Sequence, residues 1–226
     1  MTDTPLLWLA VTLAVFAAAD ALSRRLRRHP LAHPMILSTP ALIAILLLTD
    51  TPYAVYADDT ALLTFLLGPA TVALAVPLWR HLSLVRAVVK PLLAALLAGT
   101  CTAVVSAVGI AWAFGAPAEV LASLAPRSTT TPVAIALATG LGGIASLAAI
   151  IAVASGLVGA MAATPLLNAL SVSDPRARGL ATGIAAHGIG TARAFEVSEV
   201  AGTFSGIGMA LSAVTTALIL ALAPLI

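Results

Sequence analysis

The stretch that decides the fold reads STTTPVAIALATGLGGIASLAAIIAVASGLVGAMAATPLLNALSVS, from Ser128 to Ser173, and holds 46 consecutive uncharged residues. As a single helix it would measure about 69 Å at roughly 1.5 Å per residue, more than twice the roughly 30 Å of a bilayer's hydrocarbon core. The chain must therefore turn back at or inside a membrane. We expect the turns at residues 127–132 and 140–143.

The composition of the whole chain is that of a membrane protein. Of its 226 residues, 61% are hydrophobic and 9% are charged, whereas a soluble domain has about 45–50% apolar and about 25% charged residues. Aromatic residues make up only 4%, and the apolar runs show no period-two alternation, which argues against a β-barrel. We predict an all-α integral membrane protein with about six full transmembrane helices.

Basic residues set the predicted topology. Four arginines within residues 24–28 follow the first apolar segment, and the positive-inside rule places them in the cytoplasm and the N-terminus outside. A second basic cluster, at residues 80–90, follows two crossings later and agrees. We also expect Asp20 to pair with Arg24, four residues on. The chain is thus predicted to cross the inner (plasma) membrane near residues 5–22, 31–49, 60–79, 91–114, 144–167 and 204–226, with an external acidic loop at 50–59.

Two hairpins are predicted from the remaining arginines. If Arg176 and Arg178 are cytoplasmic, residues 117–142 must enter and leave on the external side, because the helix that follows supplies one crossing. Residues 175–200 would then form the cytoplasmic counterpart, an inverted-repeat arrangement typical of secondary transporters. A weak internal repeat at an offset of 60 residues supports this arrangement. The other interpretation, that both stretches are ordinary or broken crossings, stays open.

Glycine is unevenly distributed along the chain. Only Gly68 precedes residue 99, and the other 15 of the 16 glycines follow. Glycine and hydroxyl residues let helices break or approach closely inside a membrane. The pairs Gly179/Gly183 and Gly202/Gly206 have the spacing of helix-packing motifs.

This distribution predicts two parts with different roles. Residues 1–57 would be an N-terminal scaffold with the dimerisation helices. Residues 58–226 would be a transport-type domain that moves against the scaffold in an elevator-like manner. Its broken elements are expected near residues 66–78, 117–142 and 175–200.

The first polar cluster reads PRSTTTP, residues 126–132. Proline at each end disfavours helix, because the residue before a proline avoids the α region. The four hydroxyl residues supply donors, and the half-helix that begins at Pro132 points its amides and positive dipole end back at them. With Arg127 beside them, we predict a carboxylate site. In the alternative interpretation, Arg127 reaches the external surface.

The second polar cluster reads HGIGTAR, residues 187–193. Its two glycines allow the backbone to unwind, and Thr191 can cap the half-helix that follows. Arg193 and Glu196, three residues apart, share one helix face. Two interpretations stay open for Arg193, substrate contact or a structural pair with Glu196. Glu196 is either a proton site or a counter-ion.

Other chemistries lack their motifs in this sequence. No Walker-type glycine loop with lysine is present, so we expect no ATP hydrolysis. Histidines and acids do not recur at metal-ligand spacing, Cys101 is the single cysteine, and no basic domain offers a surface to nucleic acid. We therefore predict no enzyme activity and no cofactor, metal or nucleic-acid site.

Three stretches resemble the signature sequences of the LrgB/CidB family: LLGPATVALAVPL at 66–78, RSTTTP at 127–132 and HGIGTAR at 187–193. The likeness extends over essentially the whole chain. Its departures are Arg127 where lysine is common, Thr129 where valine is usual and Gly188 where alanine is common. An arginine keeps the positive charge of lysine but offers a planar fork of donors in place of a point charge.

The resemblance implies one of two functions. Family members are described as antiholin- or holin-like proteins that modulate murein hydrolases and cell lysis with a small LrgA/CidA-type membrane partner. A plastid relative is a glycolate/glycerate translocator, and bacterial members are linked to pyruvate or related short acids. Because the residues also point to a carboxylate site, we favour a secondary transporter for small 2-hydroxy or 2-oxo monocarboxylates (glycolate, glycerate, pyruvate or lactate class), proton-coupled and homodimeric. The alternative is a holin- or antiholin-like regulator, and a separate LrgA/CidA-like partner stays open.

The predicted site combines both polar clusters with part of the first signature stretch. The substrate-binding residues would be Arg127, Ser128, Thr130, Thr131, His187, Gly188, Gly190, Thr191 and Arg193, with Glu196 as proton-coupling group or counter-ion and Gly68, Pro69 and Thr71 in a supporting broken element.

Overall fold

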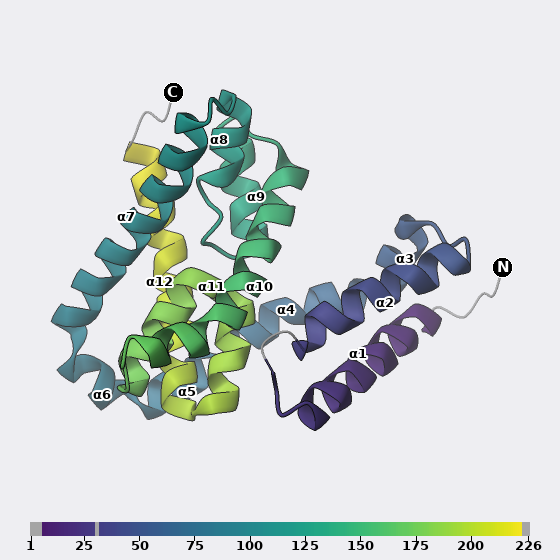
Figure 1. Cartoon of the computed structure of the whole chain (residues 1–226), viewed down its shortest axis with the longest axis horizontal. Helices are drawn as coiled ribbons and strands as arrows, with labels where there is room; N and C mark the ends of the chain where they lie inside the picture. The colour runs from purple at the N-terminus through teal and green to yellow at the C-terminus, as the bar shows by residue number, and fades with distance from the viewer. Residues whose placement is uncertain (1–5, 30–31, 223–226) are drawn as a thin grey trace. The chain divides into compact units, whose positions relative to one another are not determined.

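The computed structural model describes residues 6–29 and 32–222 (Figure 1). Helices account for most of these residues, and the described ranges contain no strand. The helices are α1 (Leu7–Arg25), α2 (Pro34–Leu48), α3 (Tyr53–Asp59), α4 (Ala61–Ala73), α5 (Ala75–Arg80), α6 (Leu82–Ala87), α7 (Val89–Ala113), α8 (Ala118–Leu124), α9 (Thr131–Gly140), α10 (Ala145–Ala169), α11 (Pro175–Val197) and α12 (Glu199–Leu222).

Five segments of the described chain are long and apolar enough to cross a membrane. They are α1, the segment Ala61–Arg80 that contains α4 and α5, and the helices α7, α10 and α12. The pair α2 and α3, bent by 120°, supplies a sixth if it counts as one span. The prediction of an all-helical membrane protein with about six spans is therefore confirmed at this level.

The acidic stretch at residues 50–59 is more ordered than the predicted loop. Residues Tyr53–Asp59 form α3. The Thr12 hydroxyl of α1 donates to the Tyr56 hydroxyl at 3.2 Å, and the rings of Trp8 and Tyr56 meet edge to face with centroids 6.1 Å apart. Packing against α1 therefore stabilises a short helix where charge alone indicated a loop.

The chain forms two compact units, residues Met1–Ala75 and Val76–Ile226. In the first unit, α1 and α2 lie side by side (Figure 1). At the end of α1, Asp20 pairs with Arg24 at 3.1 Å and with Arg28 at 3.4 Å. The predicted pair of Asp20 and Arg24 is thus confirmed, and a second arginine joins it.

The second unit is built around the contact between α11 and α12. A Cβ atom added at Gly179 would overlap the carbonyl oxygen of Ala201, and one added at Gly183 would overlap that of Ser205. The Gly179/Gly183 spacing therefore serves helix packing, as predicted. Of the other pair, Gly202 lies against the ring of Phe195, whereas Gly206 faces open space.

Helix α7 covers one side of this pair and runs beside α12 (Figure 1). The buried side chains at this contact come from all three helices. They are Leu92 and Leu96 of α7, Leu180 and Ile184 of α11, and Phe204 and Ile207 of α12. On its other side, α11 packs against α10, which also contacts α9.

Candidate functional site

The first break lies between the two short helices α8 and α9. Ala125 ends α8 as its C-cap, and Thr130 precedes α9 in an extended conformation. Between them Ser128 and Thr129 are buried. The Thr129 hydroxyl donates to the carbonyl oxygen of Pro126 at 2.8 Å, whereas the Ser128 hydroxyl oxygen has no hydrogen-bond partner within the described chain.

Arg127 is held at this break by two neighbouring helices. The Ser155 hydroxyl of α10 donates to the Arg127 carbonyl oxygen at 2.8 Å. The Arg127 guanidinium approaches the carbonyl oxygen of Ala103 in α7 with Nη2 at 3.5 Å. The break therefore lies between α7 and α10, with Arg127 directed toward α7.

The second break interrupts α11 at His187. Its φ of 36° and ψ of −128° are not helical, and positive φ strains any residue that carries a side chain. The His187 ring is buried, and its Nε2 lies 2.9 Å from the carbonyl oxygen of Ala152 in α10. Gly156 makes room for this ring, because a Cβ atom there would overlap it. Contacts with α10 therefore hold the histidine in the strained conformation.

Beyond His187 the helix turns back on itself. A Cβ atom at Gly190 would lie 2.9 Å from Cγ2 and 3.0 Å from the carbonyl oxygen of Thr182. In a straight helix, eight residues would separate these positions by about 12 Å. The two halves of α11 therefore lie side by side as a hairpin, and Gly190 permits their close approach.

Thr191 and Gly188 differ in role from the sequence prediction, in which Thr191 caps the second half-helix and the glycines let the backbone unwind. The Thr191 hydroxyl donates to the carbonyl oxygen of His187 at 2.8 Å and lies 3.0 Å from the Ser205 hydroxyl of α12. It therefore secures the turn from within the second half instead of capping its first amides. A Cβ atom at Gly188 would have only the Met209 sulfur nearby, at 3.9 Å, so the backbone break falls on the histidine and not on the glycine after it.

The two breaks meet on one turn of α10. Arg127 bonds to Ser155, and His187 contacts Ala152 and Gly156. Residues 152–156 are the eighth to twelfth of the 25 residues of α10, so the meeting point is near the middle of a helix long enough to cross a membrane.

The two predicted arginines take different positions around this point. Arg193 Nη1 lies 2.6 Å from Glu196 Oε2, so the pair that sequence left as one alternative is formed. The Arg127 guanidinium takes no part in this ion pair and approaches the Ala103 carbonyl oxygen of α7 instead. Thr130 and Thr131, which follow Arg127 in the sequence, form the N-cap and the first residue of α9.

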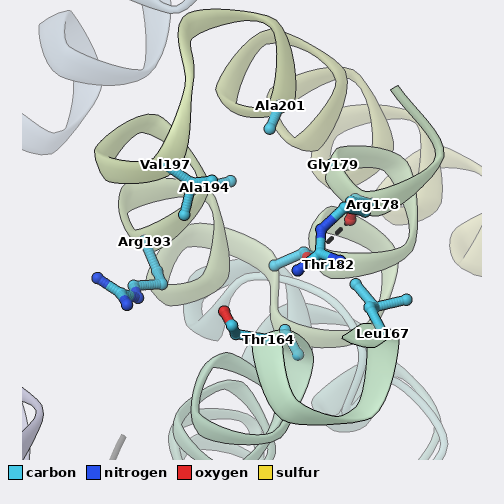
Figure 2. Close-up of a pocket in the computed structure, with 10 residues that line it drawn as sticks. Thr164, Leu167, Arg178, Gly179, Thr182, Arg193, Ala194, Val197 and Ala201 are labelled. Carbon is cyan, nitrogen blue, oxygen red and sulfur yellow. Dashed lines mark hydrogen bonds between the residues drawn. The ribbon is translucent and has the colours of Figure 1, made fainter. Parts of the chain in front are cut away.

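A hollow lies between α10, the two halves of α11 and the start of α12 (Figure 2). The hollow is small and partly open to the outside, with a cavity volume of about 30 Å³. Figure 2 shows Arg193 and Arg178 on opposite sides of it, with the Arg193 guanidinium turned away from the other labelled residues. Its lining residues are Ala163, Thr164, Leu167, Arg178, Gly179, Thr182, Arg193, Ala194, Val197 and Ala201.

Three polar residues of this lining were missed from sequence. Arg178 entered the sequence argument only as a marker of topology, and Thr164 and Thr182 did not enter it. One signal was available, because Thr182 follows Arg178 by four residues and shares its helix face. The hydroxyl of Thr182 donates to the carbonyl oxygen of Arg178 at 2.8 Å.

The neighbouring Arg176 is bound elsewhere. It forms an ion pair with Asp174 at 2.6 Å, and Asp174 also accepts from the backbone amide of Arg176 at the start of α11. The hydrogen bond from the Arg176 side chain lowers the pKa of Asp174 to about 2. Arg176 is thus a neutralised surface cation two residues from Arg178.

The supporting element at residues 66–78 is placed in part. Gly68 and Pro69 lie within α4, which ends at Ala73, and α5 begins at Ala75. The side chain of Thr71 lies outside the described residues. Within the described chain, no group of three histidine, cysteine or acidic residues could hold a metal ion.

Residues 12–225 match the LrgB-like family. The chain belongs to this family. It is 34% identical over 206 residues to the uncharacterized protein YxaC of Bacillus subtilis, covering 90% of both chains. It is 26% identical over 219 residues to the antiholin-like protein LrgB of the same species (97% and 95% covered), and 29% identical over 192 residues to the holin-like protein CidB of Staphylococcus epidermidis (85% and 84%). No solved structure matches the chain.

The match confirms the family that three sequence stretches indicated. The printed names of LrgB and CidB agree with the holin- or antiholin-like alternative more directly than with a carboxylate carrier. Together with the apolar helices, they identify a membrane protein.

Proposed function

We propose that this LrgB-like protein acts in the cell membrane as a holin- or antiholin-like protein, without enzyme activity of its own. The observation that supports this proposal is full-length similarity to relatives that carry those names. In such a role the chain would control membrane permeability and, through it, murein hydrolase activity and lysis. An LrgA/CidA-type membrane protein would be its partner.

A second candidate is supported by the geometry of the two breaks. A carrier of small 2-hydroxy or 2-oxo monocarboxylates needs interrupted helices in mid-membrane, where freed backbone groups and side chains can hold a polar substrate. The breaks at Arg127 and His187 meet beside the middle of α10. A protein that only forms lesions has no evident need for this arrangement.

The carrier candidate includes a homodimer and a movement of one part of the chain against the other. In this proposal, residues 1–57 are the scaffold of a homodimer with the N-terminus outside. Residues 58–226 move against it, with the hairpins of α8–α9 and α11 entering from opposite faces as an inverted repeat. The supporting observation is that both hairpins turn at a break, and both breaks contact α10.

Coupling to protons is part of the same candidate. A substrate with one negative charge is expelled by a negative-inside membrane potential, at about 2.3 kcal/mol per 100 mV. Symport with a proton removes this penalty. Glu196 and His187 are the proposed proton sites, one in the ion pair with Arg193 and one at the break.

Uptake into proteoliposomes separates the two candidates. The purified protein is reconstituted with trapped calcein, and entry of labelled glycolate is followed under an inward proton gradient. The carrier candidate predicts saturable glycolate uptake with calcein retained, and about a tenfold or larger loss in Arg193→Ala, because the guanidinium proposed to contact the carboxylate is removed.

The holin-like candidate predicts a different result in the same vesicles. Calcein would leave the vesicles while glycolate enters without saturation, and Arg193→Ala would leak like the wild type. Intact vesicles without glycolate uptake would contradict both candidates as activities of this chain alone. Gly109→Ala is the matched control, since the space beside Gly109 is open.

A further inference from the structure

The hollow between α10, α11 and α12 carries one uncompensated positive charge. Arg193 is neutralised by Glu196 at 2.6 Å. Arg178 instead bonds to neutral oxygens, with Nη1 donating to Asn168 Oδ1 at 2.9 Å and to the Val172 carbonyl at 2.8 Å. No carboxylate of the described chain forms an ion pair with it.

The free edge of Arg178 has the geometry of an anion site. Both of its hydrogen bonds use Nη1, so within the described residues Nε and Nη2 have no partner. These two donors form the fork that binds a carboxylate with two parallel hydrogen bonds. The Thr164 hydroxyl, which makes no hydrogen bond in the described chain, lines the same hollow.

We propose that this hollow binds one small monocarboxylate and that Arg178 is the residue that binds it. The proposal rests on the carrier candidate and adds a site that lies away from Arg127. The net charge of +1 matches a single carboxylate, and the hollow, with a cavity volume of about 30 Å³, is partly open to the outside.

The position of the hollow makes it an entry site. Thr164 follows Gly156 by eight residues along α10, about 12 Å from the turn where the two breaks meet. A carboxylate held by Arg178 would therefore lie at the end of the unit that sequence predicts to be cytoplasmic, one step before the breaks.

Direct binding to the full-length protein tests the site. The protein is placed in nanodiscs of phosphatidylcholine, and glycolate is titrated by calorimetry, with ethylene glycol as the uncharged probe. We expect glycolate to bind and ethylene glycol not to bind. Arg178→Gln should raise the Kd for glycolate at least about tenfold, because a charge-assisted bidentate contact is lost.

Two further variants keep this result interpretable. Arg176→Gln removes a charge two residues along the chain that does not line the hollow and is bound to Asp174, and its Kd should equal that of the wild type. Arg178→Lys retains the charge without the fork, so its Kd should fall between those of Arg178→Gln and the wild type. The thermal unfolding midpoint of each variant is measured first, and only variants with the midpoint of the wild type are compared in binding.

Several results would overturn the site. They are absence of glycolate binding to the wild type, an unchanged Kd in Arg178→Gln, or an equal loss in Arg176→Gln. A lipid phosphate could also satisfy the fork, and abolition of glycolate binding by phosphatidylglycerol in the nanodiscs would assign the hollow to a headgroup instead. Arg178-dependent binding without uptake would reject only the carrier, whereas saturable uptake that Arg178→Gln leaves unchanged would reject only the site.

Discussion

Gly183→Ala is expected to destabilise the protein by about 3 kcal/mol or more, near or above the upper end of ordinary overpacking. The added Cβ would overlap the carbonyl oxygen, carbonyl carbon and Cα of Ser205. These are backbone atoms of α12, so no side-chain rotation relieves the overlap. The helices must separate, and the thermal unfolding midpoint of the purified protein should fall by several degrees.

A matched substitution on the facing helix gives the control. Gly206 belongs to the second small-residue pair, but a Cβ atom there would meet nothing within 4 Å. Gly206→Ala should therefore leave the midpoint unchanged or raise it slightly, because alanine favours helix over glycine by about 1 kcal/mol. Equal midpoints for Gly183→Ala and Gly206→Ala would show that α11 and α12 do not pack as described.

Gly156→Ala and His187→Ala are expected to be strongly coupled. Alanine at 156 overlaps the His187 ring and pushes it from the carbonyl oxygen of Ala152. The single substitution should destabilise by about 1–3 kcal/mol. In a His187→Ala background the ring is absent, so the same change should have little effect, which gives a coupling energy of about 1–2 kcal/mol in unfolding measurements.

A third variant separates backbone strain from the loss of the ring. His187→Gly removes the same contacts as His187→Ala but tolerates a φ of 36°. It should be more stable than His187→Ala by about 1 kcal/mol or more. Additive effects of Gly156→Ala and His187→Ala would mean that the break does not contact α10.

The spans were predictable because their signal is strong and local. Each long apolar run was found within a few residues of its helix, as in α7 and α10, since length and hydropathy alone decide whether a segment crosses. The prolines and glycines near residues 126–132 and 187–193 also indicated interruptions. The hydrophobic pattern did not show that Tyr53–Asp59 is helical, because this helix is stabilised by contacts with Trp8 and Thr12 of α1, which is distant in the sequence.

The site was harder to predict, because its contacts join residues that are far apart in the sequence. The residue that carries the break in α11 is His187, although two glycines nearby tolerate positive φ more easily. Only the room beside Gly156 and the acceptor at Ala152 explain that choice. Similarly, Arg178 looked like a topology marker until the turn in α11 placed it in the same hollow as Arg193.

The meeting of the two breaks on α10 is tested most directly by cross-linking positions 156 and 187. Cysteines replace Gly156 and His187 in a Cys101→Ser background, and a protease site is placed between α10 and α11. A short bifunctional thiol reagent should keep the two fragments joined after cleavage. The control pair Ala169→Cys and His187→Cys should not link, since residue 169 lies thirteen residues, about 20 Å, along α10 from the Gly156 that contacts the His187 ring. Fragments that separate for the pair 156 and 187 would contradict the arrangement.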